Sequence, residues 1–169
     1  MIIQPETPAD FPQIYQLVKT AFETAAVTDG DEQDYMENLR KSDRYLPQLA
    51  LVAQMDGEPV GHIMLTRTRI SYAAQTVDAL LLSPLCVALP WRRQGIGGAL
   101  IKESLHRALA LGFSAVFLCG DPNYYGRFGF RPAAQWQIVN KGNIPPEYVM
   151  GCELYPNALP GRPGQICIV

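Results

Sequence analysis

A glycine-rich turn between an apolar strand and an amphipathic helix restricts the fold of this chain more than any other feature. The turn, residues 92–98, reads Arg-Arg-Gln-Gly-Ile-Gly-Gly. The β-prone segment 76–89 precedes it. A helix predicted over 95–111 follows it, with an apolar face made of Ile101, Leu105, Ala108 and Leu109. The apolar run 114–119 reads as a buried strand, and a strand–helix–strand crossover of this kind makes its two strands parallel.

The rest of the chain predicts one mixed α/β domain over residues 1–169, in which helices flank a central sheet. Asp56-Gly57 is a two-residue turn that joins two strands into a hairpin. Ser83-Pro84 predicts a bulge, an edge or an interruption, because proline cannot donate to a ladder. With Thr7 as the first N-cap, we expect helices at 8–22, 31–41 and 122–128, and further strands at 2–4, 49–54, 60–70, 135–139, 148–154 and 165–169.

The turn itself is suited to binding an anion. Its glycines let the backbone approach a ligand, and the start of the helix offers unpaired N–H groups and a favourable dipole. A Walker P-loop would need Lys and then Ser or Thr, where Gly98 and Ala99 follow instead. A dinucleotide fingerprint would need a third glycine at Leu100, although Asp121 imitates its ribose-binding acid. A turn that holds no ligand is a further alternative.

Composition narrows the class of protein. The formal net charge of −2 argues against a general nucleic-acid binder, which usually carries a basic face. No apolar run approaches the roughly 18 residues that span a bilayer, and the N-terminus lacks a basic flank before an apolar stretch. We therefore expect a cytoplasmic protein without a membrane partner. No cysteine has metal-ligand spacing, so we expect no metal and small buried thiols at Cys86, Cys119, Cys152 and Cys167.

Two segments resemble the GNAT superfamily of N-acetyltransferases. The pattern Arg92-x-x-Gly95-x-Gly97, between a strand and an amphipathic helix, is similar to the acetyl-CoA motif of the family. Residues 120–130, Gly-Asp-Pro-Asn-Tyr-Tyr-Gly-Arg-Phe-Gly-Phe, are similar to a YhbS-like bacterial subgroup. The resemblance covers nearly the whole chain. It implies a GNAT-like acyl-CoA N-acyltransferase fold, a central mixed sheet flanked by helices with one parallel, splayed strand pair.

The resemblance also implies roles for individual residues. Leu85, Cys86 and Val87 match the strand whose backbone lies along the pantetheine arm of acetyl-CoA. Tyr125 matches the tyrosine that protonates the departing thiolate. Homodimers are common in the family. The residues of the glycine turn match the pyrophosphate site, whose amides form its cradle: Arg92, Arg93, Gln94, Gly95, Ile96, Gly97 and Gly98.

The chemistry of acetyl transfer agrees with these roles. A free amine attacks a thioester directly, so the protein must orient the reactants, stabilise an oxyanion and manage two protons. Backbone amides near 85–87 can serve the oxyanion. A tyrosine with an ordinary pKa of about 10 is protonated at neutral pH and can act as the acid. Adjacent tyrosines cannot face the same way, so we expect one of Tyr124 and Tyr125 to pack, and the spacing in the family that the chain resembles implies Tyr125 as the acid. The base stays open, with Glu23 and Glu32 as candidates.

Two functional classes remain at this point. An enzyme would acetylate a primary amine of a small molecule or of a protein. A degenerate module would bind acyl-CoA for sensing or interaction. Retention of both the 92–98 turn and Tyr125 favours the enzyme. No histidine accompanies Cys86 in the sequence, which argues against a covalent route, and we expect His62 to be structural and His106 to lie on the polar side of its helix.

Overall fold

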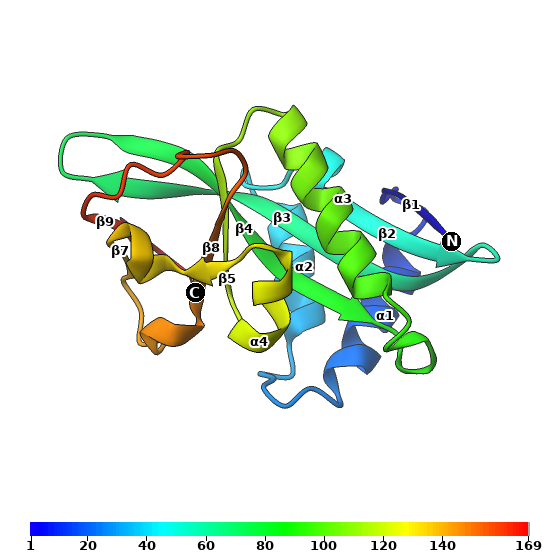
Figure 1. Cartoon of the computed structure of the whole chain (residues 1–169). Coiled ribbons are helices and arrows are strands. Elements are labelled where there is room, and N and C mark those ends of the chain that lie inside the picture. Colours follow the sequence, from blue (N-terminus) through cyan, green and yellow to red (C-terminus); the bar gives the residue numbers. More distant parts are fainter. Residues whose placement is uncertain (169) are drawn as a thin grey trace. The chain divides into compact units, whose positions relative to one another are not determined.

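The computed structural model describes residues 1–168 and divides the chain into two compact units. The first unit comprises residues 1–66 and 83–107, and the second comprises residues 67–82 and the chain from residue 108 onward. Three elements contribute residues to both units: strands β3 (Glu58–Tyr72) and β4 (Thr76–Val87) and helix α3 (Ile96–Ala110). The labels of Figure 1 are used throughout.

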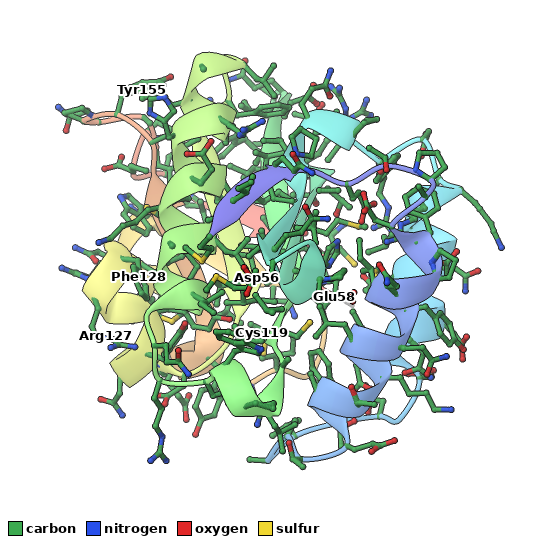
Figure 2. All side chains as sticks on the ribbon, turned by 90° about the vertical axis from the view of Figure 1, so that its right-hand side faces the viewer. Asp56, Glu58, Cys119, Arg127, Phe128 and Tyr155 are labelled. Carbon is green, nitrogen blue, oxygen red and sulfur yellow. The ribbon has the colours of Figure 1, made fainter. Side chains whose placement is uncertain are left out.

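An antiparallel sheet in the order β1-β2-β3-β4 forms the frame of the first unit. Strand β1 (Ile2–Pro5) pairs with β2 (Ala50–Met55), and β2 pairs with β3. The predicted hairpin is confirmed: Asp56 and Gly57 both adopt positive φ, 51° and 85°, as a tight hairpin turn requires. Figure 2 labels Asp56 within this turn and Glu58 at the start of the strand that follows.

Helices cover both faces of the strands in the first unit (Figure 1). Helices α1 (Phe11–Phe22) and α2 (Glu32–Arg40) bury Ile14, Val18, Met36 and Leu39 against one face, together with strand residues such as Met64. The first turns of α3 cover the other face. A Cβ at Gly61 would lie 3.0 Å from Ile96 Cγ2 and from Leu100 Cδ1, so the helix approaches β3 across a position that carries no side chain.

The second unit contains the parallel strand pair. Strand β4 pairs in parallel with β5 (Ala115–Cys119), with Leu80 opposite Val116, which confirms the crossover prediction. Its further elements are α4 (Pro122–Tyr125), η3 (Gly126–Phe128), β6 (Arg131–Pro132), η4 (Ala133–Trp136), β7 (Ile138–Asn140), β8 (Val149–Glu153) and β9 (Gly164–Ile166). Strand β8 joins β5 to β6, while β9 joins β3 to β7.

Several local predictions were wrong in their bounds. Helix α1 begins at Phe11 rather than at residue 8, because Thr7 closes a turn by donating from N and Oγ1 to Asp10 Oδ2, each at 2.8 Å. The interruption offered for Ser83-Pro84 is not found, because β4 continues through it: the φ of proline suits an extended chain and only a donor is lost, while a bulge or an edge there stays a prediction. Leu109 is 44% exposed and does not belong to the apolar face of α3.

The C-terminal bounds also differ from the prediction. Residues 135–136 belong to the helical turn η4, and β7 begins at Ile138. The short strand β6 was not predicted, because two residues carry no periodicity. The strand expected at 165–169 is found as β9, which ends at Ile166. Residue 169, the last of the predicted strand, lies outside the described residues.

A buried charged network ties β1, α2 and β3 together. The Glu6 carboxylate is fully buried and accepts hydrogen bonds at both oxygens. Arg40 donates from Nε to Oε1 at 2.8 Å and from Nη2 to Oε2 at 2.7 Å, and the Tyr45 hydroxyl donates to Oε1 at 2.8 Å. His62 Nε2 lies 2.8 Å from Oε2, so it donates to the ionised carboxylate. Four donors therefore converge on one buried acid.

These contacts determine how Glu6 titrates. Burial alone would raise its pKa, but hydrogen bonds from Arg40 and His62 outweigh burial and lower the pKa to about 2. The same carboxylate and burial raise the pKa of Tyr45, which therefore stays protonated and donating. The guanidinium of Arg40 also pairs with Glu37 and lies 4.0 Å from the centre of the Phe11 ring.

This network predicts a defined loss of stability in acid. A carboxyl whose folded pKa lies below its unfolded value stabilises the fold above the unfolded pKa, near 4.5, and loses that contribution as the pH falls through about 2. We expect Glu6 to account for on the order of 3 kcal/mol of the free energy of unfolding lost over this window. Urea unfolding between pH 5 and pH 2 measures the loss. A Glu6→Gln variant should show a correspondingly flatter pH profile, and an unchanged profile would contradict the assignment.

Candidate active site

The glycine turn leads into α3 with a backbone that projects amides. Arg93 and Gly95 adopt positive φ, 61° and 83°. The first helical bond runs from Ala99 N to Gly95 O at 3.0 Å, so the amides of Ile96, Gly97 and Gly98 precede the helical ladder and have no partner within it. Three successive donors at the positive end of a 15-residue helix form an arrangement that suits a phosphate group.

The side chains of the turn differ in whether they bond to other parts of the protein. Gln94 Nε2 donates to Pro90 O at 3.0 Å and closes the turn. The exposed Arg93 side chain has no recorded hydrogen bond or ion pair within residues 1–168. Arg92, in contrast, donates to three acceptors of its own unit: Val87 O, Thr24 Oγ1 and Ala21 O. Of the two arginines, Arg93 has the guanidinium available for a bound anion.

The end of β4 provides the backbone that was predicted to lie along a pantetheine arm. It comprises Leu85, Cys86 and Val87. The Cys86 side chain is buried in the core beneath α1 and α2. Burial raises the pKa of its thiol to about 12, despite a nearby backbone amide of His62, so the thiol is protonated at neutral pH. This burial argues against a nucleophilic role for Cys86.

Tyr125 lies in the second unit, on the short helix α4. Its ring meets Tyr124 edge-on at 4.9 Å between centroids and Phe130 at 5.8 Å. Burial, with smaller contributions from Tyr124 and Cys119, raises the pKa of Tyr125, so its hydroxyl is protonated throughout the neutral range. A protonated hydroxyl on a ring held by aromatic neighbours can donate a proton to an adjacent base.

Gly120 is needed for the position of the Tyr125 ring. A Cβ at Gly120 would lie 2.4 Å from Cε2 and 2.7 Å from Cδ2 of that ring. Its φ is not in the left-handed region, so space rather than backbone freedom requires the glycine here. Asp121 follows as the N-cap of α4 and accepts from Asn123 N at 2.9 Å. Gly120 therefore leaves room for the Tyr125 ring, and Asp121 caps the helix that carries it.

A cationic and aromatic surface adjoins Tyr125 in sequence. The guanidinium of Arg127 lies 4.7 Å from the centre of the Tyr124 ring and 5.4 Å from that of Phe128. Figure 2 shows Arg127 and Phe128 side by side on this segment. Tyr124 thus packs between Tyr125 and Arg127, which agrees with the expectation that one of the paired tyrosines has a packing role.

The candidate bases have different surroundings. Glu23 is exposed at the end of α1. Glu32 accepts from Asp29 N at 2.8 Å at the start of α2. Burial would raise the pKa of Glu32, but hydrogen bonds from Thr28 and from backbone amides outweigh it and lower that pKa. A carboxyl engaged in this way holds the α1–α2 connection together and is a weak base at neutral pH.

Other side chains considered from the sequence have structural surroundings. His62 is buried in its bond to Glu6, as expected, and His106 is exposed. Asp78 pairs with Arg67 and Arg69 at 3.4 Å on the surface of the second unit. The prediction of four buried thiols was wrong for Cys119 and Cys167, which are exposed. Cys119 is the last residue of β5, whose four preceding residues are buried.

Sequence reasoning missed the partners of Arg92 and of Glu6. Both sets of contacts join residues far apart in the chain: Arg92 and Ala21 are 71 positions apart, and Glu6 and His62 are 56. The only local signal was a polar side chain in apolar surroundings, such as His62 between Gly61 and Ile63. Within residues 1–168, no helix is both long and apolar enough to cross a bilayer, and no group of three acidic, histidine or cysteine side chains is placed to hold a metal ion.

Comparison with known proteins identifies similar chains. The acetyltransferase (GNAT) domain family matches residues 3–133. The uncharacterized N-acetyltransferase YhbS of Escherichia coli K12 is 33% identical over 139 residues, which cover 82% of this chain and 78% of that protein. The uncharacterized N-acetyltransferase YjhQ of the same strain is 33% identical over 112 residues, 66% of this chain. The matched region spans 62% of the length of YjhQ.

Solved structures show the same fold. The crystal structure of Escherichia coli YhbS in complex with CoA superposes with a TM-score of 0.86 at 27% identity, over 99% of this chain and 89% of that one. A Brucella melitensis GNAT acetyltransferase in complex with acetyl-CoA superposes with a TM-score of 0.73 at 28% identity, over 92% and 88% of the two chains. The predicted mixed sheet flanked by helices is thereby confirmed.

Proposed function

The chain belongs to the GNAT family of acetyltransferases, and on that premise we propose that it is an acetyl-CoA-dependent N-acetyltransferase that moves an acetyl group to a primary amine. The observation that carries the proposal is the start of α3, where three amides without helical partners follow a turn with positive φ. The CoA-bound and acetyl-CoA-bound structures of similar proteins support the same ligand here.

The residues fit the CoA group on their own chemistry. The amides of Ile96, Gly97 and Gly98 would hold the pyrophosphate, with the free guanidinium of Arg93 beside them. The bond from Gln94 Nε2 to Pro90 O closes the turn immediately before these amides. The backbone of Leu85 to Val87 would lie along the pantetheine arm and donate to the thioester oxygen. No metal takes part in this scheme.

In the proposed reaction, bound acetyl-CoA supplies a thioester that an amine attacks without prior activation. Backbone amides at the end of β4 stabilise the negative charge that develops on the carbonyl oxygen. Tyr125 gives its phenolic proton to the sulfur as the carbon–sulfur bond breaks. The attacking nitrogen loses a proton to water or to a neighbouring carboxylate. Small-molecule amines and protein amines both fit this chemistry.

Replacing Gly97 by glutamate tests the cofactor site. A carboxylate side chain at the second position of α3 adds bulk and negative charge where the pyrophosphate would lie, so we expect CoA to bind roughly 10- to 30-fold more weakly. Isothermal titration calorimetry with CoA measures the change. Ala110→Glu adds the same charge at the exposed far end of the same helix and should bind CoA as the unmodified protein does. Normal binding by Gly97→Glu would show that the turn does not hold the pyrophosphate.

Turnover separates the enzyme from a binding module. Thiol release from acetyl-CoA, measured against a panel of small amines, amino acids and peptides, should exceed release without acceptor for at least one class. CoA binding without release for any acceptor would leave the site assignment standing and favour a module that only binds acyl-CoA.

A further inference from the structure

The Arg92 guanidinium uses all three of its nitrogens within the first unit. Nε donates to Val87 O at 3.1 Å, Nη1 to Thr24 Oγ1 at 3.0 Å, and Nη2 to Ala21 O at 2.7 Å. The acceptors lie in two different parts of the unit: Val87 is the last residue of β4, while Ala21 is in the last turn of α1 and Thr24 lies two residues beyond its end. One planar cation therefore joins the end of the strand to the end of the helix.

The contact at α1 adds a charged donor to a carbonyl at the end of the helix. Helix α1 ends at Phe22, and the amide of Ala25 bonds to Phe22 O rather than to Ala21 O. The Thr24 hydroxyl also donates to Ala21 O, at 3.3 Å, so Arg92 is the second and closer donor to this carbonyl. The carbonyl of Ala21 lies at the negative end of the helix dipole, where a cation and a donor are both favourable. Arg92 supplies both, from 71 residues away in the sequence. The three acceptors match the forked geometry of a guanidinium, which a lysine cannot reproduce.

Apart from the contacts of Arg92, the connection between α1 and α2 is held by local hydrogen bonds, among them those of Glu32 and Gln33. Residues 24–31 connect α1 to α2 without regular structure, and Val27 is 87% exposed. Its internal bonds are local, from Asp29 N to Glu32 Oε1 at 2.8 Å and from Gly30 N to Thr28 Oγ1 at 3.1 Å. The bond from Arg92 to Thr24 spans 68 residues and ties the start of this connection to the cofactor turn.

The neighbouring Arg93 provides the contrast. Both side chains are exposed, but Arg93, which has a left-handed φ of 61°, makes no side-chain hydrogen bond or ion pair within residues 1–168. Two adjacent arginines of the same motif thus have different surroundings. One is engaged with protein acceptors, and the other has its charge available for a ligand.

We propose that Arg92 is a positioning residue that fixes the α1–α2 connection, residues 24–31, to the end of β4, while Arg93 and the amides of the turn contact the pyrophosphate. The proposal rests on the proposed function for the identity of the ligand, but its central contact is within the protein. Through Arg92, the position of the cofactor turn and that of the 24–31 connection depend on each other.

The test compares Arg92→Gln with the matched variant Arg93→Gln. Hydrogen exchange followed by mass spectrometry measures amide opening in residues 21–31 of the full chain without any ligand. Loss of the two Arg92 hydrogen bonds at the end of α1 should raise exchange in this segment by about tenfold or more in Arg92→Gln, with no change in Arg93→Gln. Arg92→Lys should resemble Arg92→Gln, because a lysine cannot reach three separate acceptors.

A second measurement uses CoA and pantetheine, which lacks the pyrophosphate, as probes in calorimetry. Arg93→Gln should weaken CoA binding several-fold without affecting pantetheine and without changing exchange at 21–31, whereas any loss of CoA affinity in Arg92→Gln should accompany raised exchange at 21–31. Unchanged exchange at 21–31 in Arg92→Gln would overturn the proposal, as would a loss of CoA affinity in that variant without raised exchange. If the unmodified protein bound neither probe, the proposed function would fail, while the exchange result would still decide the role of Arg92.

Discussion

Replacement of Tyr125 by phenylalanine should lower kcat at least about 100-fold while leaving the affinity for CoA unchanged. The substitution removes only the phenolic hydroxyl, and a general acid typically contributes a factor of 100 to 10,000 to the rate. The ring contacts with Tyr124 and Phe130 do not involve the hydroxyl and should persist. Loss of thioester measured with a reactive amine gives kcat, and calorimetry gives CoA affinity. Tyr124→Phe is the matched control and should retain most activity.

Gly120→Ala provides an independent check on the same role. The added methyl would lie 2.4 Å from the Tyr125 ring, which must move and take its hydroxyl with it. Turnover should therefore fall in the otherwise unmodified protein. The same substitution should have little further effect when Tyr125 is already phenylalanine, because the displaced group is gone. If the two substitutions reduced turnover additively in the double variant, Gly120 would act on stability alone and not through Tyr125.

Replacement of Glu6 by glutamine should reduce the free energy of unfolding by about 3 to 5 kcal/mol at neutral pH. Removing one partner of a buried ion pair leaves the other charge uncompensated, which accounts for losses of that size. Arg40 is 4% exposed at its side chain and would keep only Glu37 as a charged partner. His62 and Tyr45 would lose their shared charged acceptor. The midpoint and slope of urea unfolding measure the change.

An exposed ion pair of the same unit serves as the control for Glu6. Glu103 pairs with Arg107 at 2.7 Å on α3, and its side chain is 36% exposed. Surface pairs of this kind contribute about 0 to 1 kcal/mol, so Glu103→Gln should hardly change the midpoint. If the two variants lost the same free energy of unfolding, burial of the Glu6 network would add nothing to its contribution to stability.

Local features of the sequence were sufficient to predict most elements of the fold. Helix α3 and its glycine turn depend on periodicity and on glycines within 20 residues, and both are where they were expected. The hairpin at Asp56-Gly57 depends on two residues alone. The start of α1 was missed because the Asp10 carboxylate accepts from the amide and the hydroxyl of Thr7, so residues 7–10 form a turn before the helix, and a sequence pattern does not show such a local bond.

The candidate site was predictable to the extent that its motifs are continuous in sequence. The turn at 92–98 and the segment around Tyr125 are each short and local, so the residues could be named in advance. The contacts of Arg92 and of Glu6 could not be, because they depend on which distant carbonyls and side chains the folded chain brings within 3 Å or so of a charge. Apolar periodicity places elements, but it does not specify the partners of individual polar atoms.

The uneven burial of the four cysteines decides which reagents can follow the reaction. Cys86 and Cys152 are buried, whereas Cys119 and Cys167 are exposed. A chromogenic disulfide would therefore label two thiols of each protein molecule in addition to the thiol released from acetyl-CoA. The background would scale with enzyme concentration and would hide slow turnover. Measuring the absorbance of the thioester bond avoids this background, because no thiol reagent is used. With serine at positions 119 and 167, the chromogenic disulfide would report only the thiol released from acetyl-CoA.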